Sequence, residues 1–257
     1  MSLSMFDLTG KVAVVTGASR GLGRAIALGL ARAGANVVAA SRSQDLLERV
    51  VAAMAREGAR GMAVPCDIGV EADLDLLVER SLEQFGGIDI LVNNAGISPW
   101  VKRSEEVSRR EWDQVIDVNL TGTFLLTQKV GRRMIQRSSG GRIINIVSVG
   151  GMVALIRQIS YCVAKAGLIQ MTRVLAAEWS GRYDINVNAI APSYFATDLT
   201  HGMRQSEKIR RNLLSRTPKG RFGDPNEVVG AAIFLASEAS SYVTGSVLMV
   251  DGGWTAT

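Results

Sequence analysis

The sequence predicts an α/β fold in which helices cover both faces of a parallel, doubly wound sheet of about seven strands. Short runs rich in valine and isoleucine alternate with longer segments whose apolar residues recur at helical spacing. Continuous apolar runs are typical of parallel strands that are buried on both faces. No linker composition and no internal repeat interrupts the alternation. We therefore expect one domain over residues 1–257.

Composition and charge favour a globular protein that binds a small ligand. Of the 257 residues, 47% are hydrophobic and 21% are charged, which is enough apolar material for a self-sufficient core. The net charge of +5 is modest. Its arginine pairs are scattered over separate predicted helices, as Arg109-Arg110, Arg132-Arg133 and Arg210-Arg211. This pattern indicates solvated helix faces rather than a nucleic-acid surface, so we expect no nucleic-acid partner.

Several features predict a cytoplasmic protein with no membrane partner. No run approaches 18 apolar residues, and residues 1–10 lack the charged start and apolar centre of a signal peptide. The two cysteines, Cys66 and Cys162, lie far apart in apolar surroundings and form no C-x-x-C pair, which favours a reducing compartment.

The first strand leads into a phosphate-binding turn. Residues 11–16 form a β-branched run, a glycine-rich turn follows, and a helical stripe over residues 24–33 ends at Gly34. Glycines let the backbone approach a pyrophosphate, and the helix N-terminus offers free N–H groups and a positive dipole end. The expected contacts are Gly17, Ser19, Arg20, Gly21, Leu22 and Gly23.

The end of the second strand predicts which dinucleotide binds. The strand covers residues 36–40, and about 20 positions past the glycines an acid would hold the ribose 2′-OH of NAD. That place holds Ser41 and Arg42, and the nearest acid is Asp45. Because a guanidinium can pair with a 2′-phosphate, and Arg20 lies in the same region, we expect NADP(H) in preference to NAD(H).

Two further strand–helix units follow. The predicted elements are a helix over 44–57, a strand over 60–65, a helix over 71–85 and a strand over 88–92. Asp67 comes directly after the third strand, where it could accept a hydrogen bond from an adenine amine or cap the next helix near Asp73. The fourth strand runs into Asn93, Asn94, Ala95 and Gly96, a turn that leaves room for a flat ligand.

The second half continues the alternation. We expect a long helical segment over 111–136 interrupted near Asn119, a strand over 142–147, a helix ending near 179 and a strand over 185–190, then a helix over 224–236 and a strand over 246–250. Asn119 is either a tolerated core polar group or a side chain that holds the helix backbone open for a water. Residues 193–218 are polar and form a lid-like insertion after a strand end, where specificity loops lie.

One stretch predicts proton-transfer chemistry. Tyr161 and Lys165 are four apart on a predicted helix, so they share one face, and a nearby ammonium lowers the pKa of a phenol. Ser148 follows a buried strand and faces the crevice at the carboxyl ends of the sheet. The three side chains can therefore converge on one carbonyl, with tyrosine giving or taking a proton.

Together these motifs, with Asn119 and the segment from Pro192 to Thr197, resemble the short-chain dehydrogenase/reductase family over essentially the whole chain. The resemblance implies a Rossmann-like fold and hydride transfer between a nicotinamide dinucleotide and a carbonyl or alcohol. Tyr161 would be the acid or base, Lys165 would lower its pKa and bind the nicotinamide ribose, Ser148 would hold the substrate oxygen and Asn119 a relay water. Pro192 and Thr197 would contact the nicotinamide, Asp67 and Ile68 the adenine, and Asn94, Ala95 and Gly96 the adenosine.

The chain departs from the family pattern at Ser193, where glycine is usual, and this puts the nicotinamide side of the pocket in doubt. Within the family it resembles the gluconate 5-dehydrogenase and 2-deoxygluconate 3-dehydrogenase group. Arg157, if buried or half-buried near Ser148, could grip a substrate carboxylate, or it could serve a subunit contact or a solvated loop. The candidate substrate contacts are Trp100, Arg157, Tyr194 and His201. No metal site is expected.

Three functions remain open from the sequence. The first is oxidoreduction of a small polar substrate, a sugar acid by resemblance. The second is reduction of a β-ketoacyl carrier protein, which predicts a basic patch made of Lys102, Arg103, Arg109 and Arg110. The third is a catalytically silent dinucleotide-binding regulator, against which the intact Asn119, Ser148, Tyr161 and Lys165 argue. The resemblance also implies a homotetramer that packs helices 111–136 and 158–179 against partners.

Overall fold

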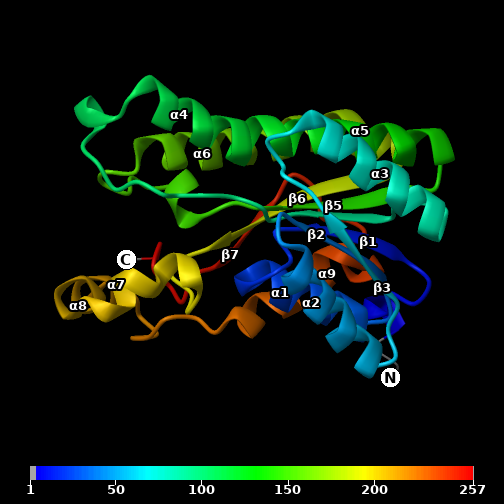
Figure 1. Ribbon diagram of the computed structural model, residues 1–257, viewed down its shortest axis with the longest axis horizontal. Helices are drawn as coiled ribbons and strands as arrows, with labels where there is room; N and C mark the ends of the chain where they lie inside the picture. Colours follow the sequence, from blue (N-terminus) through cyan, green and yellow to red (C-terminus); the bar gives the residue numbers. More distant parts are fainter. Residues whose placement is uncertain (1–3, 257) are drawn as a thin grey trace.

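The structure is a computed structural model that describes residues 4–256. Its strands are all parallel and form one sheet in the order β3-β2-β1-β4-β5-β6-β7, which confirms the predicted doubly wound, Rossmann-like fold (Figure 1). The strands are β1 Val12–Thr16, β2 Asn36–Ser41, β3 Gly61–Pro65, β4 Ile90–Asn93, β5 Gly141–Ile146, β6 Ile185–Pro192 and β7 Val247–Val250.

Helices cover both faces of this sheet. In Figure 1, α3, α4, α5 and α6 lie on one face, and α1, α2 and α9 lie on the other. The α-helices of the described residues are α1 Gly21–Arg32, α2 Gln44–Arg56, α3 Glu71–Phe85, α4 Arg109–Ile116, α5 Gly122–Arg137, α6 Ile159–Tyr183, α7 His201–Gln205, α8 Glu207–Ser215 and α9 Val229–Ala236. The three layers explain why the strands read as uninterrupted apolar runs.

Two large apolar cores form, one on each face of the sheet, and a smaller third cluster includes Leu168 and Ile169 of α6. Side chains alternate across a strand, so Ala13 and Val15 join the core beneath α1, α2 and α9, whereas Val14 joins the core beneath α3, α5 and α6. Val37 and Val38 divide between the two cores in the same way. Because both faces are buried, the carboxyl-terminal edge of the sheet is where polar strand ends can meet a ligand.

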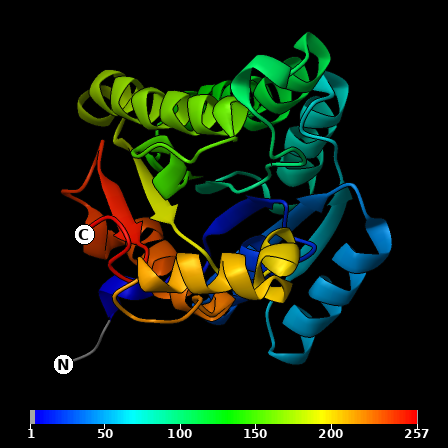
Figure 2. The ribbon, with the colours of Figure 1, turned by 90° about the vertical axis from the view of Figure 1, so that its left-hand side faces the viewer.

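The strand order reverses between β1 and β4. From β1 the chain moves outward to β2 and β3, then returns past β1 to add β4 and the strands beyond it. Such a reversal leaves a crevice at the carboxyl ends of the two central strands. Figure 2 shows α7 and α8, in yellow to orange, crossing in front of this end of the molecule on the side of the sheet that carries α1, α2 and α9.

The structure refines several expected elements. The long helical segment is interrupted, as predicted, by a π-helical turn over Asp117–Thr121 that separates α4 from α5. The insertion over 193–218 is not an extended loop, since it folds into α7 and α8. Asp224 caps the last helix through Asn226, as predicted, although the first turn is a 3₁₀ helix over Pro225–Val228.

No helix within residues 4–256 is long and apolar enough to cross a membrane. Nor does this part of the chain place three or more histidine, cysteine, aspartate or glutamate side chains together as a candidate metal site. The expected lack of a signal peptide concerns residues 1–10, of which 1–3 lie outside the described residues.

Candidate active site

A cleft of about 1630 Å³ opens at the carboxyl-terminal edge of the sheet. It is continuous from the glycine-rich turn after β1 to the Ser148 and Tyr161 side chains beyond β5. Every predicted cofactor contact lines it: Gly17, Ser19, Arg20, Gly21, Leu22, Gly23, Ser41, Arg42, Asp67, Ile68, Asn94, Ala95, Gly96, Tyr161, Lys165, Pro192 and Thr197. The structure therefore places all of the predicted cofactor contacts in one cavity. The role of each residue remains a proposal.

The glycine-rich turn is shaped in a way that side chains would prevent. Gly17 and Gly21 have φ angles of +64° and +55°, in the left-handed region that favours glycine. A Cβ on Gly23 would lie 2.3 Å from the Gly17 carbonyl oxygen. Arg20 precedes α1 without a side-chain hydrogen bond to the helix N-terminus, so that end remains accessible to a phosphate.

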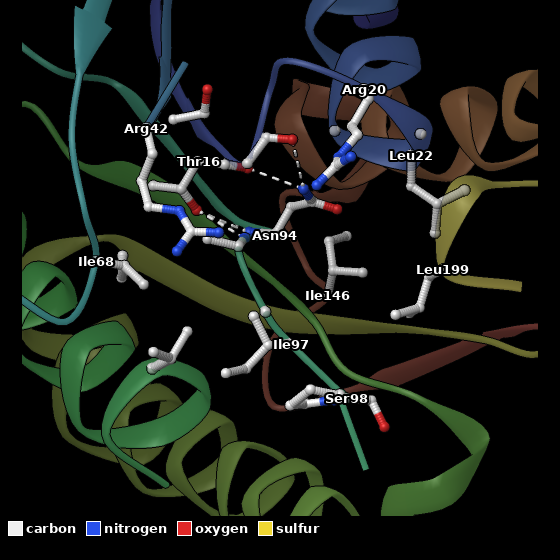
Figure 3. Close-up of a pocket in the computed structure, with 18 of the residues that line it drawn as sticks. Thr16, Arg20, Leu22, Arg42, Ile68, Asn94, Ile97, Ser98, Ile146 and Leu199 are labelled. Carbon is white, nitrogen blue, oxygen red and sulfur yellow. Dashed lines mark hydrogen bonds between the residues drawn. The ribbon is translucent and has the colours of Figure 1, made fainter. Parts of the chain in front are cut away.

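Asn94 and Thr16 hold this turn against the end of β4. The Asn94 Nδ2 atom donates to the carbonyl oxygens of Thr16, at 2.9 Å, and of Gly17, at 3.3 Å. The Thr16 hydroxyl accepts from the backbone N–H groups of Asn94 and Ala95, both at 3.0 Å. Figure 3 shows these bonds as dashed lines around Asn94. Asn94 thus positions the turn through its amide nitrogen. The sequence predicted only a cofactor contact for this residue.

Two exposed arginines lie near the turn. Arg42 Nη1 lies 3.9 Å from Asp67 Oδ2, and Arg20 Nη1 lies 3.4 Å from Asp198 Oδ2. Figure 3 shows both guanidinium groups reaching toward Asn94, and the ends of Ile97, Ile146 and Leu199 extending the lining away from them. A glycine turn without side chains, an open helix end and two cations fit the pyrophosphate and 2′-phosphate of NADP.

Asp67 does not cap α3. Its Oδ1 atom accepts from the backbone of Gly69 at 3.0 Å, and its own backbone N–H donates to Asp73 Oδ2 at 2.8 Å. The α3 helix begins after Val70, which offers no side-chain hydrogen bond. Of the two roles left open by the sequence, the helix cap is therefore wrong, and the carboxylate keeps its place in the cleft lining.

At the other end of the cleft, Ser148, Tyr161 and Lys165 come together. The Ser148 hydroxyl accepts from the backbone of Gly150 at 3.0 Å, which orients the oxygen. Tyr161 and Lys165 occupy successive turns of α6, with the Lys165 Nζ atom 5.7 Å from the Tyr161 ring centroid. Lys165 is buried, and its ammonium donates to the Ile146 carbonyl at 2.8 Å. The lysine can thus direct its remaining N–H groups into the cleft from a fixed base.

Burial shifts the pKa values of both Tyr161 and Lys165. Burial raises the pKa of Tyr161, and hydrogen bonding from Ser148 opposes this rise. Burial also lowers the pKa of Lys165 to about 8. The net pKa of Tyr161 is therefore raised in the protein on its own, and the lowering effect of Lys165 stays a prediction. In both groups the largest cause is desolvation, which disfavours the charged form.

Asn119 is fully buried in the π-helical turn and bonds to Ile97 through both ends of its amide. The Oδ1 atom accepts from the Ile97 N–H at 2.7 Å, and Nδ2 donates to the Ile97 carbonyl at 2.8 Å. The sequence left open whether Asn119 is a tolerated core polar group or holds the helix open for a water. Because both ends of its amide are hydrogen-bonded to Ile97, the first description fits. Ile97 lines the cleft beside Gly96, so Asn119 positions this wall from behind.

The four candidate substrate residues lie outside the lining of this cleft. Arg157 is exposed, in contrast to the buried or half-buried arginine expected, and has a φ angle of +70°. His201 is exposed at the start of α7, and Trp100 is half-buried. Tyr194 is half-buried beside two lining residues, Ser193 and Phe195.

Ser193 fits its position without the freedom of glycine. Among the described residues, Ser193 is not one of the non-glycine residues with a positive φ angle, so its backbone conformation tolerates a Cβ. Its hydroxyl donates to the Asp251 carbonyl at 2.9 Å, which ties the end of β6 to the segment after β7. The departure from the family pattern therefore adds a contact.

Sequence reasoning missed Thr16 and Ile97 as parts of the site. Thr16 was the last residue of a predicted strand, and only its position before Gly17 signalled that its hydroxyl could serve the turn. Ile97 carried no signal, because its importance depends on Asn119, 22 residues away. Hydrogen bonds between distant segments have no local pattern.

The fold and cleft define a class, a dinucleotide-binding oxidoreductase in which serine, tyrosine and lysine share one site. A family model described as enoyl-(acyl carrier protein) reductase matches residues 17–255. The chain belongs to the short-chain dehydrogenase/reductase family, and it is an NAD(P)-dependent enzyme that acts on CH–OH groups.

Individual relatives extend over the whole chain. The chain is 42% identical to a 2-dehydro-3-deoxy-D-gluconate 5-dehydrogenase of Escherichia coli over 260 residues, covering 100% of both. It is also 42% identical to a 3-oxoacyl-[acyl-carrier-protein] reductase of Aquifex aeolicus, covering 96% of this chain and 98% of the relative. A gluconate 5-dehydrogenase from Burkholderia cenocepacia, solved in complex with NADP and tartrate, superposes with a TM-score of 0.95 at 37% identity, covering 100% of both chains.

Proposed function

We propose that the protein interconverts a ketone and a secondary alcohol on a sugar acid, with NADP(H) as its cofactor. The observation that carries the proposal is the continuous cleft, with Arg20 and Arg42 at one end and Ser148, Tyr161 and Lys165 at the other. The names of the Escherichia coli and Burkholderia cenocepacia relatives support the substrate class, and the NADP in the latter structure supports the cofactor.

The chain's own residues would position the substrate and move one proton. The nicotinamide supplies or accepts the hydride when it is bound. In the direction of reduction, the Tyr161 hydroxyl gives its proton to the substrate oxygen, which becomes the alcohol oxygen. Ser148 hydrogen-bonds the same oxygen, and Lys165 stabilises the tyrosinate that remains. In the direction of oxidation, the tyrosinate takes the alcohol proton back.

Reduction of a β-ketoacyl carrier protein is the second candidate, and the Aquifex aeolicus relative supports it. It requires a basic surface for an acidic partner. Three of the four cations expected to form that surface are paired: Lys102 with Glu111, Arg103 with Glu105 and Arg109 with Asp113. Because carboxylates offset these charges, the surface favours the small substrate. The silent regulator loses its support, since the chain is an enzyme by family.

The test is NADPH oxidation by the purified protein with 5-ketogluconate and an acetoacetyl thioester assayed side by side, each repeated with NADH. Turnover of the keto acid with NADPH is the expected result. Turnover of the thioester alone would move the enzyme to acyl-chain chemistry. Equal rates with NADH would remove the assigned role of Arg42.

We also propose a homotetramer in the cytoplasm. Apolar side chains are exposed on α5 and α6, among them Phe124 at 41%, Val163 at 39% and Val174 at 44% exposure, which supports burial of these helices against partner copies. Both cysteines are free, which supports a reducing compartment. Light scattering coupled to gel filtration measures the assembly, and cell fractionation measures the location.

A further inference from the structure

An aromatic cluster lies beside the catalytic end of the cleft. The Tyr194 ring packs edge-on against Trp254 at a centroid distance of 5.9 Å and against Phe222 at 6.5 Å. Tyr194 follows the cleft residue Ser193, whose hydroxyl bonds to the segment after β7. Figures 1 and 2 show this C-terminal segment beside the end of β6. The cluster is therefore tied to the cleft wall.

Arg216 is held on this cluster with its charge uncompensated. Its guanidinium carbon lies 4.3 Å from the centroid of the Trp254 ring, a cation–π contact that restrains a long side chain. Within residues 4–256, no carboxylate lies within 4.0 Å of Arg216 and no hydrogen bond occupies its guanidinium. Arg216 is exposed, whereas the Trp254 Nε1 atom is buried and has no hydrogen-bond partner in the same part of the chain. The guanidinium of Arg216 is thus the group of this cluster that offers several N–H donors to an anion.

Several other cations near the cleft are less suitable for binding a carboxylate. Lys102 and Arg103 are paired with glutamates, and Arg204 donates to the Thr197 carbonyl at 3.2 Å. Among the described residues, Arg157 likewise has no such partner, and it is exposed as Arg216 is, but no aromatic ring stacks on it to fix its position. Arg216 combines a fixed position with an available fork of donors, which is the arrangement that recognises carboxylates.

Tyr194 connects Arg216 to the reacting centre. The positive charge of Arg216 is near enough to oppose the rise that burial causes in the pKa of Tyr194. In turn, the charge of an ionised Tyr194 contributes to raising the pKa of Tyr161, after burial as the larger cause. In the contacts of the structure, Trp254 lies between Arg216 and Tyr194, and Tyr194 follows the cleft residue Ser193. This arrangement suits a substrate whose carboxylate is several carbons from its carbonyl.

We propose that Arg216, stacked on Trp254 next to Tyr194, binds the carboxylate of the substrate and makes the enzyme selective for acids over neutral sugars. This inference rests on the proposed function and names the residue that would confer its substrate class. The carboxylate would accept the guanidinium N–H groups at one end while the ketone oxygen meets Ser148 and Tyr161 at the other.

The experiment compares 5-ketogluconate with its neutral methyl ester in the wild type and in Arg216→Leu, with NADPH saturating. Loss of a charge-assisted contact lowers kcat/KM for the acid by about 10- to 100-fold. The value for the ester and the KM for NADPH stay within about twofold. Arg216→Lys keeps the charge without the planar fork, so its effect on the acid is smaller.

Arg182→Leu is the matched control. Arg182 is an exposed arginine that also stacks on an aromatic ring, 5.1 Å from the Tyr183 centroid. It lies 21 residues beyond Tyr161 on α6, which corresponds to roughly 30 Å of helix. We expect Arg182→Leu to leave kcat/KM unchanged for both 5-ketogluconate and its methyl ester. A general cost of losing an exposed stacked arginine would appear in this variant as well.

Three outcomes would overturn the inference. Equal losses on acid and ester in Arg216→Leu would show a structural role. Loss of acid preference in Arg157→Leu, with Arg216→Leu unaffected, would assign the carboxylate to Arg157. A wild type that prefers the ester or reduces neither compound would remove the proposed sugar-acid function, and the role of Arg216 with it.

Discussion

Replacing Arg42 with leucine tests whether the end of β2 selects NADP(H). Arg42 is 69% exposed, and its only carboxylate neighbour among the described residues is Asp67 at 3.9 Å. An exposed ion pair of this kind contributes at most about 1 kcal/mol, so it competes weakly with a phosphate. Charge-assisted hydrogen bonds contribute about 1.5–3 kcal/mol. We therefore expect a net loss of about 1–2 kcal/mol, or about 5- to 30-fold in kcat/KM for NADPH.

The assay measures kcat/KM for NADPH and for NADH with the same carbonyl substrate. NADH carries no 2′-phosphate, so its value stays within about twofold. The control is Arg24→Leu, which removes an exposed arginine from the first turns of α1 that does not line the cleft. Equal losses with both cofactors, or the same loss in Arg24→Leu, would refute the reasoning.

Three further changes test the site's construction. Gly23→Ala places a Cβ 2.3 Å from Asn94 Nδ2, so we expect a destabilisation of about 1–3 kcal/mol in denaturant unfolding and a weaker NADP Kd in fluorescence titration. Ser193→Gly removes the bond to the Asp251 carbonyl, so stability falls by about 1 kcal/mol while kcat stays within about twofold. Lys165→Met tests the lowered lysine pKa. Because the folded value is about 8 and the ordinary value 10.5, burial disfavours the charged form below pH 8, and this penalty disappears as the pH rises toward 10.5. Without cofactor, the free energy of unfolding of the wild type therefore gains about 3 kcal/mol relative to Lys165→Met over this range.

The sequence was sufficient for the fold and for most of the cofactor cleft. Parallel strands buried on both faces have a local signature, and the turn at Gly17 and Gly23 occupies one short segment. Ser148 and Tyr161 were predictable because each lies at a definite position relative to a strand or helix. For these residues, the local sequence pattern was enough to predict their position in the structure.

The remaining features depend on contacts between distant segments. Arg157 drew attention because it is close to Tyr161 in sequence, yet it is exposed. Arg216 is far from Tyr194 in sequence and joins its cluster only because β6 pairs with β7, which brings Trp254 beside Tyr194. The pKa of Tyr161 likewise depends on how deeply the folded chain buries it, which spacing along α6 does not reveal.

The central claim is that Tyr161 transfers the proton in a cleft that binds NADP(H) independently of it. Tyr161→Phe removes only the hydroxyl, and the fully exposed Tyr242→Phe is its control. The decisive measurement is the rate of NADPH oxidation with 5-ketogluconate, together with the NADPH Kd of each variant. We predict a fall in kcat of about 10²-fold or more for Tyr161→Phe, with an unchanged Kd and a normal Tyr242→Phe. Turnover by Tyr161→Phe at the wild-type rate would contradict the mechanism.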